Sequence, residues 1–173
     1  MKLVSHNDPI LRQTTEKFDF SNPPFDPIEF AVDLTKFMYD NNALGVTANQ
    51  IGVPYQVFSL RAYPQNFVVF NPRIIMPGHE HITLEETSLT YPGLIVKVKR
   101  PQHVRVRFNT PNGDTRTETF TGLSARIFQH AVDQLNGIVY YDKANLYHKE
   151  QALKKWKKNV KDQSSGTILQ PTG

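Results

Sequence analysis

The sequence contains no cysteine, and this absence removes several chemistries at once. Without thiol groups the chain can form no disulfide, supply no thiolate nucleophile and offer no thiolate ligand to a metal. Any catalysis would therefore depend on His, Asp, Glu, Ser, Thr or Tyr side chains. The sequence also lacks the roughly 18 consecutive apolar residues of a membrane helix and an N-terminal apolar run typical of an export signal. We therefore expect a cytoplasmic protein without membrane contact.

Charge and size add two expectations. With 173 residues, of which 39% are hydrophobic, the chain is long enough to bury one core, and we expect a single domain over residues 1–161. The formal net charge of +4 is concentrated around the single tryptophan, Trp156. The lysines in this run are Lys154, Lys155, Lys157, Lys158 and Lys161. Residues 162–173 are rich in Ser, Gly, Pro and Thr, which predicts a flexible tail.

Helical signals occur in three places. Asp26 and Pro27 suit an N-cap and a first helical position, and apolar residues recur at helical spacing after them, so we predict a helix over about 27–41. The same spacing returns over about 123–136, where Asn136-Gly137 is typical of a helix end. A basic helix is predicted over 149–160.

Short runs of β-branched and aromatic residues, separated by Pro and Gly, fill the middle of the chain and predict antiparallel strands. They cover residues 56–60, 67–70, 94–98, 104–108 and 115–121. Asn112-Gly113 lies between the last two runs and predicts a hairpin. Strands grouped together, followed by helices, indicate an α+β fold.

Three short segments contain the residues that carry a family resemblance. Residues 43–50 read ALGVTANQ, residues 86–90 read ETSLT, and residues 129–134 read QHAVDQ. In order and spacing they resemble the peptide deformylase motifs G-x-G-L-A-A-x-Q, E-G-C-L-S and Q-H-E-x-D-H. Weaker matches extend this resemblance over roughly residues 2–147. The resemblance implies a mixed or antiparallel sheet around a central helix, which carries the third motif.

The resemblance also implies a chemistry. In a deformylase, one Cys and two His hold a divalent metal, and the metal activates a water that attacks the N-formyl group of a peptide. The Glu beside the first His moves the proton. The backbone N–H after the Cys and the Gln of the first motif stabilise the developing oxyanion.

This chain departs from that pattern at three positions. His130 keeps the first His position, but Gln134 replaces the second His, Ser88 replaces the Cys and Ala131 replaces the Glu. Neutral hydroxyl and amide groups are poor ligands for zinc or iron, and a methyl group cannot accept a proton. We therefore expect no cofactor, with a zinc, iron or nickel site weak or absent, and no ordinary metal-dependent deformylation.

The residues outside the metal-binding and proton-transfer positions match the family. Gly45, Gln50 and the backbone N–H of Leu89 correspond to the oxyanion and peptide-docking side, and we expect them to bind substrate together with His130. Glu86 and Arg100 resemble a structural ion pair of the family. The sequence thus predicts a deformylase homologue whose cleft either binds N-terminal Met-containing peptides without turnover or has been filled and serves only as a scaffold.

Other interpretations stay open at this point. His130 and Gln50 could be buried structural residues. Ser88, His130 and Asp133 have the residue types of a hydrolase triad, but Asp133 follows His130 by three residues on one predicted helix, which is a poor position for orienting the imidazole. Two alternative functions are an active deformylase or amide hydrolase with a rebuilt site, and a ribosome or RNA-binding module. The second would use Lys154, Lys155, Lys157 and Lys158.

Overall fold

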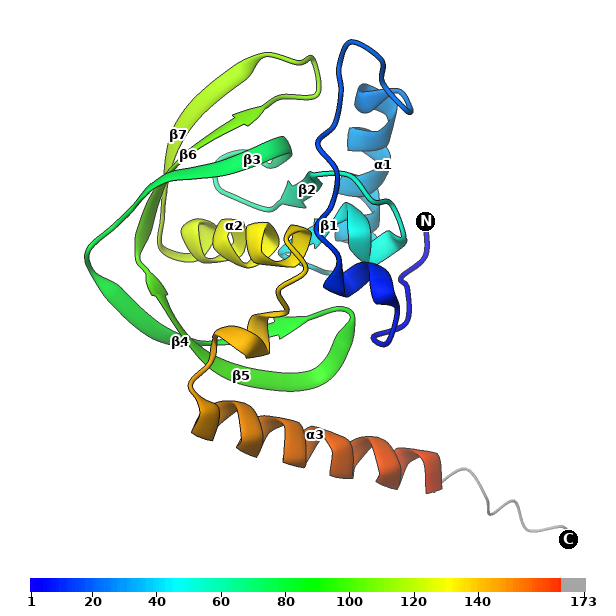
Figure 1. Cartoon of the computed structure of the whole chain (residues 1–173), viewed down its shortest axis with the longest axis vertical. Coiled ribbons are helices and arrows are strands. Elements are labelled where there is room, and N and C mark those ends of the chain that lie inside the picture. Colours follow the sequence, from blue (N-terminus) through cyan, green and yellow to red (C-terminus); the bar gives the residue numbers. More distant parts are fainter. Residues whose placement is uncertain (166–173) are drawn as a thin grey trace, which may run out of the picture.

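The structure, a computed structural model, describes the backbone of residues 1–165 and the side chains up to Lys161. It confirms the α+β fold, with two antiparallel sheets curved around a central helix (Figure 1). The larger sheet has the strand order β1-β2-β3-β6-β7, and the smaller one pairs β4 with β5. The strands are β1 (Gly45–Thr47), β2 (Val57–Leu60), β3 (Phe67–Pro77), β4 (His81–Ser88), β5 (Tyr91–Pro101), β6 (His103–Asn109) and β7 (Thr115–Thr121). The helices are α1 (Pro27–Asp40), α2 (Gly122–Leu135) and α3 (Leu146–Ser165), with short 3-10 turns η1 (Pro9–Arg12), η2 (Ala48–Ile51) and η3 (Tyr140–Lys143).

Helix α1 begins where its capping signal predicts. The Asp26 carboxylate accepts hydrogen bonds from the backbone N–H groups of Ile28, at 2.8 Å, and Glu29, at 3.1 Å. These bonds satisfy two of the N–H groups that a helix start leaves without partners. The buried residues of α1 are Ala31, Leu34 and Met38. The predicted helix over about 27–41 is confirmed, because both its cap and its apolar spacing are local features.

The strand predictions are confirmed for β2, β3, β5, β6 and β7, although β3 and β5 run longer than predicted. The hairpin between β6 and β7 also forms, with Asn109 paired to Thr115 and Gly113 at a φ of 89° in the turn. Two strands were missed. Strand β1 has only three residues, and β4 is exposed over most of its length, so neither shows a clear alternation of buried and exposed positions.

Helix α2 lies at the centre of the molecule and packs one face on the larger sheet. Phe128 is fully buried there, and its ring contacts Phe58 at 5.1 Å and Phe120 at 5.3 Å between centroids. Val104 and Val106 of β6 complete the inner surface of the sheet. Ala131 of the third motif belongs to the same cluster, and the adjacent His130 lines the cleft, so the hydrophobic core helps to fix the position of His130.

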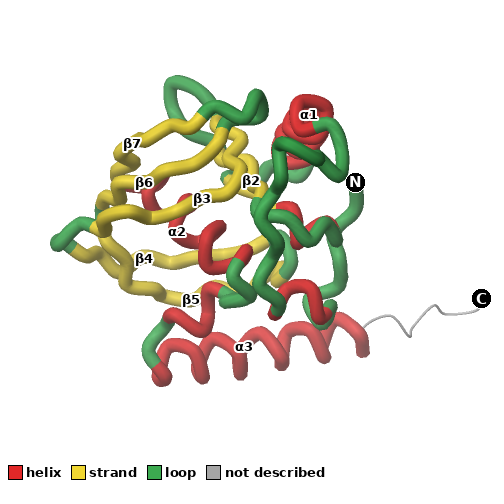
Figure 2. Tube along the Cα trace, turned by 45° about the horizontal axis from the view of Figure 1, so that its top comes forward, coloured by secondary structure: helices red, strands yellow, loops and turns green. Residues whose placement is uncertain are grey.

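Helix α3 lies along the smaller sheet, next to β5 (Figure 2). Its buried side consists of Ala152, Leu153 and Trp156, and the Trp156 indole donates a hydrogen bond to the Pro92 carbonyl at 2.8 Å. The predicted basic helix over 149–160 is confirmed but is longer than predicted, because it begins at Leu146 and includes residues 162–165, which were predicted to belong to the tail. The remaining tail residues, 166–173, lie outside the described part of the chain. No helix within residues 1–165 is long and apolar enough to cross a membrane.

Candidate functional site

A cleft of about 510 Å³ brings the three motifs together. Its lining includes the predicted binding residues Gly45, Gln50, Leu89 and His130. Ser88 and Ala131 line the same cleft, whereas Gln134 does not. The apolar part of the wall comes from Ala43, Leu44, Leu89, Pro92, Leu123 and Ile127. An apolar concave surface with a few polar groups at its base is the usual form of a small-ligand site.

Gln50 links the first motif to the second. Its amide oxygen accepts hydrogen bonds from the Thr47 backbone N–H at 3.0 Å and from the Thr47 hydroxyl at 3.1 Å. Its amide nitrogen donates to the hydroxyls of Ser88, at 3.1 Å, and Thr90, at 2.9 Å. Both amide hydrogens therefore have protein partners. A ligand carbonyl would have to compete with one of these two hydroxyls for Gln50.

Two unused polar groups face the cleft. The Ser88 hydroxyl accepts from Gln50 and, at 3.4 Å, from the Thr90 backbone N–H, so its own hydrogen remains available. The Nδ1 atom of His130 lies 3.0 Å from Glu86 Oε2, and the His130 ring stacks on Tyr140 at 5.2 Å. Among the described residues, Nε2 of His130 makes no hydrogen bond. If Nδ1 carries the proton toward Glu86, Nε2 is an acceptor.

The triad of Ser88, His130 and Asp133 does not form. Asp133 accepts a hydrogen bond from Arg100 at 2.7 Å instead of orienting His130. The carboxylate that contacts His130 belongs to Glu86, and no hydrogen bond joins Ser88 to His130 within the described chain. The reason lies in the partners, since Asp133 is engaged by Arg100 and Lys143 whereas the Nδ1 atom of His130 is engaged by Glu86.

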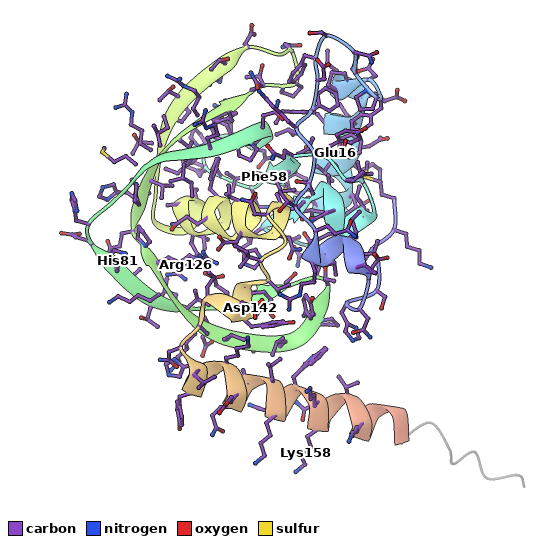
Figure 3. All side chains as sticks on the ribbon, viewed as in Figure 1. Glu16, Phe58, His81, Arg126, Asp142 and Lys158 are labelled. Atoms are coloured by element: carbon purple, nitrogen blue, oxygen red, sulfur yellow. The ribbon has the colours of Figure 1, made fainter. Side chains whose placement is uncertain are left out.

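The predicted ion pair of Glu86 and Arg100 is confirmed, and it is part of a larger buried cluster. Arg100 binds both carboxylate oxygens of Glu86, at 2.5 and 3.0 Å. A second guanidinium, that of Arg126, contacts the same carboxylate at 2.7 Å and also donates to the carbonyls of Ile82, at 2.7 Å, and Val98, at 3.0 Å. Figure 3 marks Arg126 at the junction of α2 and the smaller sheet.

Arg126 was missed by sequence reasoning. It precedes the third motif, and an Arg on a predicted helix is normally read as a solvated surface residue. Here only 6% of its side chain is exposed. The signal that could have found it was its position four residues before His130, which places both side chains on one helix face.

Glu86 makes the stability of the protein depend on pH. Its burial opposes ionisation, but the hydrogen bonds from His130 and Arg100 outweigh this effect and lower the pKa of Glu86 from 4.5 to about 2. The resulting stabilisation, about 3 kcal/mol, should be complete above pH 4.5 and be lost as the pH falls through about 2. Urea unfolding of the parent and of Glu86→Gln at a series of pH values measures it. The two stabilities should converge in acid; a constant difference down to pH 2 would contradict the assignment.

The donors at the metal-ligand positions do not fit a divalent metal. The amide nitrogen of Gln134 donates to the Leu11 carbonyl at 3.4 Å, and its buried amide oxygen has no partner among the described residues. This side chain does not line the cleft, and the Ser88 oxygen already accepts two hydrogen bonds. In the described part of the chain, no group of three or more His, Cys, Asp or Glu side chains could hold a metal ion. Of the three residues at the metal-ligand positions, Ser88, His130 and Gln134, only His130 offers a suitable ligand atom, Nε2.

Gly45 has a packing role in addition to its place in the cleft. A Cβ atom built there would lie 2.7 Å from the Cγ2 methyl of Ile127 and 3.3 Å from the Ser59 carbonyl oxygen. Gly45→Ala is therefore expected to lower the free energy of unfolding by about 1–3 kcal/mol through overpacking. Chemical denaturation measures this change. In the Ile127→Ala background the same substitution should be less destabilising, and equal losses in both backgrounds would show that the contact with Ile127 is not responsible.

Comparisons with known proteins agree with this geometry. The family model described as polypeptide deformylase matches residues 1–150. The chain is 33% identical to a peptide deformylase of Aquifex aeolicus, over 92% of this chain and 96% of the relative. It is 36% identical to a protein named peptide deformylase-like from Rhizobium meliloti, over 73% of this chain and 74% of the relative. The crystal structure of peptide deformylase from Thermus thermophilus superimposes with a TM-score of 0.83 at 27% identity, covering 88% of this chain and 90% of that one. The chain therefore belongs to the polypeptide deformylase family.

Proposed function

We propose that this family member binds the N-terminal methionine region of peptides in its cleft without hydrolysing the formyl group. The observation that supports this proposal is the contrast between the two halves of the site. Gly45, Gln50 and Leu89 line a cleft that remains open, whereas Ser88 and Ala131 line it where the family motifs have the metal-binding Cys and the proton-transferring Glu. A cleft that keeps its docking residues but lacks these two catalytic residues supports binding without turnover.

The cleft suits a main-chain amide that stands next to an apolar side chain. Leu44, Leu123 and Ile127 offer apolar surface of the kind that a methionine side chain buries. At the base, His130 Nε2 can accept a hydrogen bond and the Ser88 hydroxyl can donate one. A secondary amide carries both complementary groups, an N–H and a C=O.

The remaining polar groups are poor catalysts. Ala131 lines the cleft with a methyl group, so no carboxylate can move a proton from that position. His130 also lines the cleft, but the carboxylate that orients it, Glu86, is shared with Arg100 and Arg126. Glu86 is thus engaged by two guanidinium groups and is not dedicated to orienting His130 for proton transfer.

Calorimetric titration with a short formyl-Met peptide, combined with an assay for released formate, tests the proposal. We expect saturable binding and no formate release. Leu44→Asp places a charge on the cleft wall and should weaken binding, whereas Leu146→Asp changes an exposed leucine of α3 and should not. Steady formate release by the parent, or equal binding by both variants, would overturn the proposal.

An active enzyme with a rebuilt site is the competing interpretation. The triple variant Ser88→Cys, Ala131→Glu, Gln134→His separates the two possibilities. If the parent is inactive because of these three residues, the triple variant should bind a divalent metal and release formate, whereas the parent should do neither. If the parent releases formate at the rate of the triple variant, the competing interpretation is correct.

A second candidate function is supported by α3. Its lysines Lys154, Lys155, Lys157 and Lys158 are all exposed, because the helix turns Leu153 and Trp156 toward β5. Four exposed ammonium groups on a docked helix suit an RNA surface such as the ribosome. Co-sedimentation with ribosomes should decrease steeply with salt and be weakened when these lysines are changed to Glu. Unchanged co-sedimentation of that variant would remove this candidate.

A further inference from the structure

We propose that the outer face of β5 and β6 binds the phosphate backbone of double-stranded RNA. This surface, the outer basic face, is formed by exposed cationic side chains at alternate positions of the two strands and at one position of β3. They are Lys97 and Lys99 of β5, Arg105 and Arg107 of β6, and Arg73 of β3. The proposal goes beyond peptide binding and does not depend on it.

The alternation of the two strands places these cations on one side of the molecule. The buried positions between and beside them are Val96 and Val98 of β5 and Val104 and Val106 of β6. Successive strand residues point to opposite faces, so the cations point away from the core, with about 6.6 Å between those that are two residues apart. Both sheets curve around α2, so their outer side is convex (Figure 1).

The cations of this face have little counter-charge in the protein. Within the described chain, none of their five side chains forms an ion pair or a hydrogen bond. Among their cross-strand partners the only acidic residue is Glu85, opposite Lys97. Arg73 and Arg107 are direct cross-strand partners of each other. Like charges in this position are destabilising, so an anionic ligand would relieve a repulsion.

The residues around the cations favour the backbone of a double strand. Thr119 lies beside Arg105 and Thr117 beside Arg107, and both threonines are exposed. Guanidinium groups bind phosphate through two parallel N–H bonds, and a threonine hydroxyl can hydrogen-bond a ribose 2′-hydroxyl. In the described chain, the exposed positions of β5, β6 and β7 carry no Phe, Tyr or Trp. Unpaired bases would therefore find no ring on which to stack.

An anionic membrane is another surface that attracts exposed lysine and arginine side chains. The shape of the outer basic face favours RNA, because a convex surface meets a flat bilayer at few points. A convex surface can instead follow the minor groove of an RNA duplex, which is wide and shallow and displays the 2′-hydroxyls.

Helix α3 and its lysines lie on the other side of β5. Trp156 packs on the hydrophobic cluster that contains Val96 and Val98. These valines alternate with Lys97 and Lys99 and therefore point to the opposite face of the strand. The outer basic face and the lysines of α3 are thus two surfaces that mutation can separate.

Fluorescence anisotropy with a labelled RNA duplex of mixed sequence tests this inference. The variants are Lys97→Gln with Lys99→Gln, Arg105→Gln with Arg107→Gln, and the control Lys2→Gln with Lys17→Gln, which removes the same charge from exposed residues near the N-terminus. We expect each pair on the outer basic face to weaken binding by at least about tenfold and to reduce the salt slope by about 2, one for each lost phosphate contact. The control pair should change neither. Arg105→Lys with Arg107→Lys keeps the charge and should keep the salt slope.

Four results would overturn the inference. The first is an equal loss in the control pair, which would indicate attraction by net charge alone. The second is a loss only when the four exposed lysines of α3 are changed to Glu, which would assign the RNA contact to α3. The third is equal affinity for a DNA duplex of the same sequence. The fourth is tighter binding to vesicles of phosphatidylserine and phosphatidylcholine than to RNA. Circular dichroism shows that each full-length variant is folded, as expected for changes at exposed positions.

Discussion

Replacing Glu86 by Gln is expected to lower the free energy of unfolding by about 3–5 kcal/mol at pH 7. The loss arises because Arg100 and Arg126 remain buried, each less than 7% exposed at its side chain, while their common counter-charge is removed. Asp133 still pairs with Arg100, but Arg126 keeps only the carbonyls of Ile82 and Val98. Urea denaturation at constant ionic strength measures the change.

Glu85→Gln is the matched control for this variant. Glu85 precedes Glu86 on β4 and is exposed, so the same chemical change should alter stability by no more than about 0.5 kcal/mol. The thermal midpoint should follow the same order, with the Glu86 variant well below both the parent and the control. Similar losses for the two variants would mean that charge on β4 in general, and not the buried cluster, stabilises the fold.

The cluster also shows what the sequence could and could not predict about the site. The pair of Glu86 and Arg100 was expected from the family resemblance, because Glu86 stands in the second motif and Arg100 in a weaker match after it. Arg126 belongs to no motif, and its contact with Glu86 spans 40 residues of sequence. Such a contact depends on how α2 packs against the smaller sheet. Local patterns carry no information about that packing.

Gln134 is a second residue whose contacts could not be predicted from the motifs. The motif places it at a ligand position, yet its side chain hydrogen-bonds the Leu11 carbonyl, 123 residues away, and stays outside the cleft lining. Gly45, Gln50, Leu89 and His130, which the resemblance assigns to one side of the site, all line the same cleft. Where a residue departs from the family pattern, the resemblance no longer predicts which way its side chain points.

In the fold as well, local features were predictable and tertiary contacts were not. Caps and helical spacing are local, so α1 and α2 were predicted closely, and the turn at Gly113 identified the hairpin of β6 and β7. Strand β4 is mostly exposed on both faces, which removes the alternation that identifies a strand. It is held by pairing with β5 and by the hydrogen bond from Arg126 to Ile82, and both interactions are tertiary.

Phe128→Ala is expected to lower the free energy of unfolding by about 3–5 kcal/mol, because it removes a fully buried ring and leaves a cavity. Phe128 stacks on Phe120 of β7 and contacts Phe58 of β2 edge to face. It therefore joins α2 to strands toward opposite edges of the larger sheet. Thermal and urea denaturation measure the loss. Leu123→Ala on the same helix is the control, since Leu123 is 56% exposed and its truncation should change stability by about 0.5 kcal/mol or less.

This variant also tests whether the core positions the cleft. Arg126 and His130 flank Phe128 on α2, and both depend on the helix to reach Glu86. If packing of Phe128 fixes the helix against the sheet, Phe128→Ala should weaken peptide binding more than Phe128→Leu, which keeps most of the apolar volume. Peptide affinity that is unchanged in a folded Phe128→Ala variant would show that the charged cluster alone holds α2 against the smaller sheet.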